Sequence, residues 1–385
     1  MMKSSRRTCA TMLFVATLAT SALTGCNESS ENKASDTNTP ATPIESEKPV
    51  TQSQQPISGP GGSDYTNDDM RVSSGGTGDD AWFVFEPIDP QPKTAPLAII
   101  MHGYFEFSGY DSMRALIEHT VRKGYVVIYP RWQTTPVTPC PGPANIEPCI
   151  TSAVAGIRGA LDYLKADSSR VQPELDRTSY FGFSFGGIVT ANMLNRWESL
   201  ELPKPRVMML DDPHDGGYVG AREPALDHFL DGIPSTTLAF CHSGAHGVFD
   251  DTYAGLGGQL SDIGRQKTDG SCNQVFSRLT TIPDSRKSLV LTSEDNHGSP
   301  ALTSDHGVCT STPVDAYDWG FCWRAWDALR DCADTGQHCE YAFGDTSQNR
   351  YIGTWSDGVP IIGLKIQSQT PIRAEPTPAR QRAPN

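Results

Sequence analysis

The sequence lacks the features that mark a membrane-spanning or nucleic-acid-binding protein. Beyond residue 23 it has no apolar run long enough to cross a bilayer. It is also poor in positive charge, because 31 lysines and arginines stand against 45 aspartates and glutamates, a formal net charge of −14. Such a balance repels nucleic acid and anionic lipid surfaces, so we expect neither as a partner.

Internal repeats and closely spaced cysteine pairs are absent as well. The ten cysteines form no CxxC pair, so a common zinc-ligand spacing is missing, and we expect no metal or other cofactor. Eight of them follow residue 26, an even set compatible with four disulfides in an oxidising compartment. Loop length favours pairing Cys140 with Cys149 and Cys332 with Cys339. The sequence leaves open how the last two bridges join Cys241, Cys272, Cys309 and Cys322.

The N-terminal segment has the pattern of an export signal. Three cations precede an apolar stretch, residues 9–23, that is too short for a permanent membrane helix. The stretch ends in LTGC, which resembles a bacterial lipobox and implies cleavage after residue 25 and lipidation of Cys26. Asn27, in place of aspartate, favours the outer membrane, and the acyl chains would be the only membrane contact. An ordinary signal peptide with an incidental cysteine is the alternative.

Segments of low complexity flank one region of globular composition. Residues 26–63 are rich in small and polar residues and almost free of large apolar ones, which predicts a disordered tether. Residues 368–385 predict a disordered tail for the same reason. Residues 64–367, between them, are long enough for one globular domain with a sizeable core. The predicted order is therefore a signal peptide over 1–25, tether, domain and tail.

Strand-like and helical segments alternate along this domain. Strand-like runs lie at residues 81–85, 96–101, 125–129, 179–181, 206–210, 236–240 and 288–292. Helical spacing occurs at residues 113–123 and 150–165. The alternation predicts an α/β fold, with a mostly parallel central sheet flanked by helices. Ligands of such sheets bind beyond the carboxyl ends of the strands, so polar residues there are candidates for a site.

Ser184 stands at the centre of a GxSxG pattern, directly after the strand-like run 179–181 and before the helical run 187–194. The glycines permit a sharp turn from strand to helix that exposes the hydroxyl, so we predict a nucleophile elbow. A serine nucleophile also needs a base and an oxyanion site. The backbone N–H groups of Tyr104 and Phe185 are the predicted oxyanion donors. His102 precedes the serine in the chain, so we expect a structural role for it.

Several residues are candidates for the base and the acid. His297 directly follows the last strand and is the first choice for the base, with His306, nine residues later, as the alternative. His242 and His246 follow the preceding strand and are candidates for lining the site. The candidate acids are Asp211 and Asp212, after the strand that follows the elbow helix, and Asp250, after the next strand.

Four motifs resemble the chlorophyllase family of α/β-hydrolases. They are MHGY at 101–104, YVVIYP at 125–130, GFSFGG at 182–187 and LDDPHDG at 210–216. More distantly, the chain is similar to platelet-activating-factor acetylhydrolases and polyester-degrading cutinases. The similarity covers residues 82–298 and implies the α/β-hydrolase fold. The segment 306–355, with its cysteines and tryptophans, has no counterpart in the resemblance.

The resemblance also implies roles for particular residues. The chlorophyllase acid lies in a DPxDG motif, which matches residues 212–216 and selects Asp212. Asp211 stays the alternative, because acetylhydrolases place the aspartate immediately after the leucine of the strand. Residues 272–276, 288–291 and 295–297 resemble the family's approach to its histidine and favour His297. Plant chlorophyllases have a basic residue where Phe185 stands.

Together these features predict a serine carboxylic-ester hydrolase that forms an acyl-enzyme on Ser184. The aromatic residues Tyr104, Phe105, Phe107 and Trp132, expected at the mouth of the pocket, suggest an apolar or lipid-like ester. The alternatives are a catalytically inactive surface binding lipoprotein that retains the fold, and an acyltransferase. The sequence leaves the oligomeric state open.

Overall fold

The computed structural model describes residues 48–104, 106–135, 137–140, 145–214, 226–245, 272–310 and 312–367. Several features predicted from the sequence lie outside these residues: the signal peptide, the lipidation site Cys26, the C-terminal tail, Phe105, His246 and the alternative acid Asp250. Within the described ranges, no helix is both long and apolar enough to cross a membrane.

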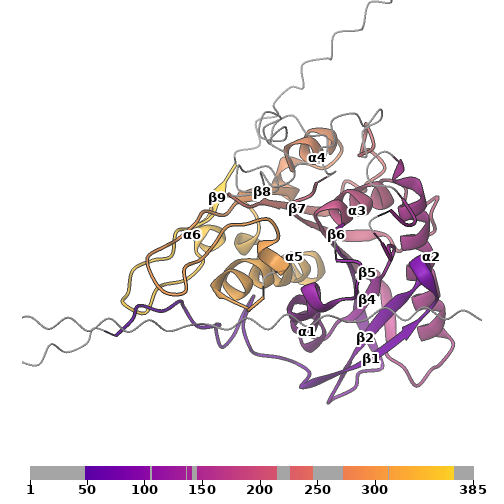
Figure 1. Cartoon of the computed structure of the whole chain (residues 1–385), viewed down its shortest axis with the longest axis horizontal. Coiled ribbons are helices and arrows are strands. Elements are labelled where there is room, and N and C mark those ends of the chain that lie inside the picture. Colours follow the sequence, from indigo (N-terminus) through magenta and orange to yellow (C-terminus); the bar gives the residue numbers. More distant parts are fainter. Residues whose placement is uncertain are drawn as a thin grey trace, which may run out of the picture. The chain divides into compact units, whose positions relative to one another are not determined.

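A nine-stranded sheet forms the centre of the domain (Figure 1). Its order is β1-β2-β4-β3-β5-β6-β7-β8-β9; β3 to β8 run parallel, and β1, β2 and β9 join antiparallel at the edges. The strands are β1 (Asp69–Gly75), β2 (Trp82–Ile88), β3 (Thr94–Met101), β4 (Val126–Pro130), β5 (Gln172–Phe183), β6 (Pro205–Asp211), β7 (Leu238–Ser243), β8 (Lys287–Leu291) and β9 (Lys365–Ile366). The expectation of an α/β fold with a mostly parallel sheet is confirmed.

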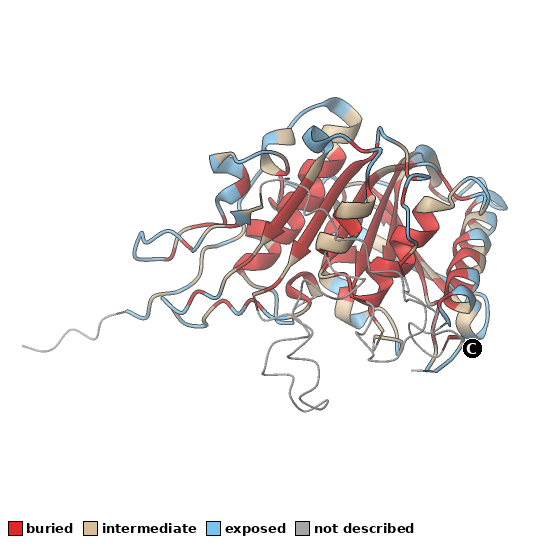
Figure 2. Ribbon diagram, turned by 90° about the horizontal axis from the view of Figure 1, so that it is seen from above, coloured by how far each residue is buried: buried red, intermediate tan, exposed pale blue. Residues whose placement is uncertain are grey.

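Helices cover both faces of the sheet, which is why its central strands are continuous apolar runs. The helices α2 (Glu147–Lys165), α3 (Phe185–Asn195) and α4 (Cys272–Arg278) pack into one apolar core. The helices α1 (Arg114–Arg122) and α5 (Trp323–Thr335) pack into the core on the opposite face (Figure 1). Figure 2 shows the strands between these layers as buried.

Residues 306–355, the segment without a counterpart in the resemblance, pack into the core that contains α1 and α5. This segment contains a π-helical turn (Asp318–Cys322), α5 and the short helix α6 (Ser347–Arg350). Trp326 and Trp355 in it are almost fully buried. The Trp326 ring lies 5.9 Å from that of Phe181 on β5, centroid to centroid. Trp326 therefore covers the sheet at β5, whereas Trp355 contacts Asp295 and His297 in the loop after β8.

The expected boundary of the disordered tether is wrong for residues 48–63. The backbone N–H of Gly61 donates to Asp327 Oδ2 at 2.8 Å, and that of Ser299 donates to the carbonyl of Val50 at 2.9 Å. A Cβ on Gly61 would lie 2.2 Å from the carbonyl oxygen of Trp319, so only glycine permits this approach. Contacts with distant parts of the chain order a segment whose own composition is that of a linker.

All eight cysteines beyond residue 26 form disulfides. Two bridges, Cys140–Cys149 and Cys332–Cys339, confirm the pairs favoured by loop length. The other two, whose pairing the sequence left open, are Cys241–Cys272 and Cys309–Cys322. Cys241–Cys272 joins β7 to α4, and Cys309–Cys322 ties the loop after β8 to the π-helical turn.

Asp318 in the π-helical turn makes stability depend on pH. Burial, together with the nearby carboxylates of Asp315 and Asp211, raises the pKa of Asp318 to about 8, although the N–H of Asp315 donates to its Oδ2 at 2.8 Å. Between pH 3.8 and about 8 the folded protein then holds a proton that the unfolded chain releases, so stability falls as the pH rises through this range.

We expect Asp318→Asn, which keeps the acceptor but cannot ionise, to remove this loss. The melting temperature of the variant should exceed that of wild type by more at pH 8 than at pH 4.5. At pH 8 the corresponding gain in the free energy of unfolding is at most about 5 kcal/mol. Thermal denaturation at both pH values measures the difference, with the exposed Asp80→Asn as control. A difference between Asp318→Asn and wild type that is the same at both pH values would contradict the account.

Candidate active site

Ser184 lies at the sharp turn between β5 and α3. Its backbone has φ 52° and ψ −127°, a conformation that costs a residue with a side chain about 1–3 kcal/mol. Three hydrogen bonds hold it: its N–H donates to the carbonyl of Asp211 at 2.9 Å, and its carbonyl accepts from the N–H groups of Gly187 at 2.9 Å and His214 at 3.0 Å. The surrounding backbone thus fixes a strained serine, as the nucleophile elbow requires.

The glycines around Ser184 allow this turn to pack against its neighbours. A Cβ on Gly186 would lie 2.0 Å from the carbonyl oxygen of His102, and one on Gly182 would lie 2.5 Å from Thr190 Oγ1. Contacts below 3.0 Å would force the surrounding backbone or side chains to move. Gly186 is therefore needed for close approach to the residue after β3, and Gly182 for the packing of β5 against α3.

A histidine and an aspartate from two other loops meet Ser184. His306 Nε2 lies 2.9 Å from Ser184 Oγ, and His306 Nδ1 lies 2.8 Å from Asp212 Oδ2. Asp212 follows β6, and His306 lies in the loop after β8. Both loops leave the carboxyl ends of parallel strands, the edge where ligands of such sheets bind. The Phe183 ring, 4.8 Å from that of His306, packs beside the pair.

The Asp212 carboxyl is ionised, as an acceptor for the N–H of the His306 imidazole should be. Burial opposes its ionisation, but the charge of His306 and the hydrogen bond to it outweigh this, and the pKa of Asp212 lies below its usual value. An ionised carboxylate accepts the Nδ1–H of His306, which leaves the Nε2 lone pair facing the serine hydroxyl.

His214, which the sequence analysis did not select, is a further histidine near the site. Its ring lies 6.4 Å from that of His306, at 83°. Burial, reinforced by the charge of nearby His306, lowers the pKa of His214 to about 3, so its imidazole is neutral at physiological pH. Its place two residues after Asp212, inside the DPxDG match, is the signal in the sequence that points to it.

The structure does not bring His297, the first choice for the base, to Ser184. His297 Nε2 lies 2.7 Å from Asp357 Oδ2, and 38% of its side chain is exposed. The cause is the buried Asp295, whose Oδ2 accepts from Trp355 Nε1 at 3.1 Å and from the backbone N–H of Ile362 at 2.8 Å. This anchor directs the loop toward the C-terminal segment.

The loop then returns to the sheet before it reaches His306. Backbone hydrogen bonds of 2.9 Å in both directions pair Asp295 with Leu302, and Ser304 is fully buried. Residues 296–301 form the excursion between the paired positions, which carries His297 outward. The alternative candidate, His306, is the one that reaches the serine.

The two neighbouring candidate acids separate to different partners. Asp211 Oδ1 lies 2.6 Å from His242 Nδ1, whereas Asp212 lies beside His306. Asp211 is the last residue of β6, whereas Asp212 follows the strand with a φ of 45°, so the backbone turns between them and the two side chains reach different partners. Of the two, the structure places Asp212 in the group.

The two residues whose backbone N–H groups are the predicted oxyanion donors contact each other through their side chains. Phe185 is the first residue of α3, and the first N–H groups of a helix have no intrahelical acceptor. The Tyr104 ring packs edge-on against the Phe185 ring, with centroids 5.5 Å apart. Their role as oxyanion donors stays a prediction, with the amino end of a helix as its electrostatic basis.

His102 and Trp132 lie in the core beneath these residues. The ring nitrogens of His102 lie 2.7 Å and 2.6 Å from the carbonyl oxygens of Gly103 and Arg131. The Trp132 ring stacks on that of His102 at 4.6 Å and is fully buried. Trp132 is therefore a core residue, and its expected place at the mouth of a pocket is wrong.

A cluster of potential metal ligands and a cavity also occur among the described residues. The potential ligand atoms of Asp211, His242 and Cys309 lie within 4.8 Å of one another. The sulfur of Cys309 is bonded to Cys322, whereas a cysteine ligand must be a thiolate, so this set does not fit a metal ion. A cavity of about 750 Å³ lies at the amino ends of β6 and β7, lined in part by Arg206 and Leu238. It includes none of the residues around Ser184.

A hydroxyl, an imidazole and a carboxylate linked in this order form the arrangement that activates serine for nucleophilic attack. No protein-family model matches the chain, and a search of curated proteins found no significant match.

Proposed function

We propose that the chain is a serine hydrolase of carboxylic esters with an α/β-hydrolase fold. The observation that carries the proposal is the linked set of Ser184, His306 and Asp212, with contacts of 2.9 and 2.8 Å. In chain order the three run Ser, Asp, His, as in α/β-hydrolases. His306 takes the role of base that the sequence analysis gave first to His297.

The proposed reaction is a two-step acyl transfer to water. Ser184 Oγ attacks the ester carbonyl while His306 Nε2 takes its proton, and Asp212 stabilises the resulting imidazolium. The N–H groups of Tyr104 and Phe185 donate to the oxygen on which negative charge develops. As the tetrahedral intermediate collapses, the alcohol leaves with the proton from His306. Water, deprotonated by His306, then releases the acid and restores Ser184.

Composition and neighbouring side chains support an apolar or lipid-like ester. The Phe183 ring packs beside that of His306, and the Tyr104 ring packs against that of Phe185, the residue after Ser184. The net charge of −14 disfavours anionic substrates. The four disulfides favour an oxidising compartment, in agreement with the proposed export and lipid anchoring at Cys26.

Ester hydrolysis tests the proposal. Full-length protein with intact disulfides should hydrolyse p-nitrophenyl esters, with a preference among acyl lengths. Ser184→Ala should lower kcat/KM by about 10⁴-fold or more, because the nucleophile is lost. The exposed Ser199→Ala serves as control and should retain wild-type rates. A folded wild type without turnover on any ester, or a Ser184→Ala variant with wild-type rates, would overturn the proposed function.

A further inference from the structure

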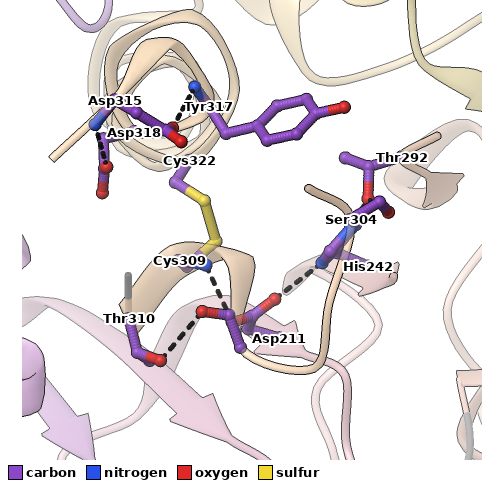
Figure 3. Close-up of a disulfide and its surroundings, with 11 residues drawn as sticks. Asp211, His242, Thr292, Ser304, Cys309, Thr310, Asp315, Tyr317, Asp318 and Cys322 are labelled. Carbon is purple, nitrogen blue, oxygen red and sulfur yellow. Dashed lines mark hydrogen bonds and ion pairs between the residues drawn. A yellow bond between two sulfur atoms is a disulfide. The ribbon is translucent and has the colours of Figure 1, made fainter. Parts of the chain in front are cut away.

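A second carboxylate–imidazole pair lies one residue away from the proposed acid. Asp211 Oδ1 and His242 Nδ1 are 2.6 Å apart, and both side chains are fully buried (Figure 3). Neither contacts Ser184 Oγ or the His306 ring in any hydrogen bond within the described ranges. The proposed reaction thus makes no use of a costly buried pair.

The side chains of this pair reach the loop of His306 on both sides. On one side, His242 Nε2 lies 2.9 Å from Thr292 Oγ1, which in turn lies 2.5 Å from Ser304 Oγ, two residues before His306. On the other side, Asp211 Oδ2 accepts from the backbone N–H of Cys309, three residues after His306, at 3.3 Å. Figure 3 shows this group beside the disulfide.

The backbones of the same two residues hold the other members of the proposed site. The carbonyl of Asp211 accepts the N–H of Ser184 at 2.9 Å, and the carbonyl of His242 accepts the N–H of Asp212 at 2.8 Å. The φ of Asp212 is 45°, so its backbone is strained and needs such support. The nucleophile, the acid and both flanks of the base therefore converge on Asp211 and His242.

The loop that they hold has little regular structure of its own. Between β8 and the short helical turn Val308–Thr310, His306 lies on a stretch whose place depends on side-chain contacts. Catalytic groups displaced by about 1 Å lose on the order of 10²-fold in rate. Taking a carboxylate and an imidazole out of water costs free energy that their mutual contact often only offsets, so stability alone does not account for this pair.

We propose that Asp211 and His242 are positioning residues, which act through Thr292 and Ser304 to hold His306 in line with Ser184. This inference rests on the proposed function, since its effect is on the proposed base. It requires that the hydroxyl of Thr292 matters for catalysis, and not only its volume. The pair contributes geometry to the reaction and exchanges no proton with the substrate.

Variants at Thr292 and His242 test the inference by kcat and KM on the preferred p-nitrophenyl ester, using full-length protein. Thr292→Val, which removes the hydroxyl and keeps the shape, should lower kcat about tenfold and leave KM within about twofold. Thr292→Ser keeps the hydroxyl and should restore kcat to within about threefold of wild type. His242→Gln should lower kcat about 10²-fold.

His119 offers a matched control. Its Nε2 lies 2.9 Å from Asp327 Oδ2, both side chains are almost fully buried, and the pair joins α1 to α5 away from Ser184. His119→Gln should lower the melting temperature as His242→Gln does, but leave kcat per folded molecule within about twofold of wild type. A loss of kcat in His242→Gln alone separates positioning from general destabilisation.

Three results would overturn the inference. In the first, Thr292→Val and His242→Gln both keep wild-type kcat. In the second, Thr292→Ser is as impaired as Thr292→Val, which would assign the effect to packing. If His242→Gln does not fold, the two Thr292 variants decide. In the third, a wild type inert toward every ester would refute the proposed function and this inference with it, whereas an active wild type with unimpaired variants would refute the inference alone.

Discussion

His306→Ala is expected to lower kcat/KM for the preferred ester by about 10⁴-fold, whereas His297→Ala should keep it within about twofold of wild type. The reason is geometric: His306 Nε2 lies 2.9 Å from Ser184 Oγ, and His297 instead pairs with the partly exposed Asp357. Initial rates over a range of ester concentrations, with circular dichroism to confirm folding, measure both effects.

The His297 variant is the matched control, because both histidines belong to one loop and each has an aspartate partner. Loss of a partly exposed ion pair costs about 0–1 kcal/mol, so the melting temperature of His297→Ala should change little. Equal losses of activity in the two variants, or a larger loss in His297→Ala, would contradict the assignment of His306 as base.

Asp212→Asn is expected to lower kcat by about 10⁴-fold with little change in the fold. The amide cannot stabilise an imidazolium, and its NH₂ group favours the wrong tautomer of His306. The pKa of Asp212 lies below its usual value, so the wild-type carboxylate is charged throughout the physiological range and the asparagine removes a charge that is present. Steady-state kinetics at neutral pH measure the loss.

Asp211→Asn distinguishes the two neighbouring acids. Asp211 contacts His242 and not His306, so its variant should lose activity only through the placing of the loop, at most about 10²-fold. If Asp211→Asn lost as much activity as Asp212→Asn, the assignment of Asp212 to His306 and of Asp211 to His242 would be wrong for the active protein.

Much of the scaffold could be predicted from local sequence. Runs such as residues 96–101 and 207–210 are apolar throughout, and strands buried on both faces of a parallel sheet require this. The glycines beside Ser184 mark the turn because a Cβ at residue 186 has no room. The apolar runs and the glycines each involve only a few neighbouring residues, so they can be recognised without the tertiary structure.

The choice between His297 and His306 could not be made this way. It depends on Asp295, whose carboxylate binds groups on Trp355 and Ile362, 60 and 67 residues further along the chain. The choice between Asp211 and Asp212 depends on where β6 ends and on the turn that follows it, in which Asp212 has a φ of 45° and its N–H donates to the carbonyl of His242. Residues 48–63 are likewise ordered by contacts with residues distant in sequence, such as Asp327. Contacts over long sequence separations decide these positions.

Covalent labelling tests the central claim most directly. Activated serine nucleophiles attack fluorophosphonates and become covalently labelled. Full-length protein treated with such a reagent should carry one phosphonate on the peptide that contains Ser184, as identified by mass spectrometry. The label should be absent from Ser184→Ala and should form far more slowly on His306→Ala. A folded, disulfide-intact wild type that takes up no label, or takes it up on another residue with Ser184 unmodified, would contradict the account.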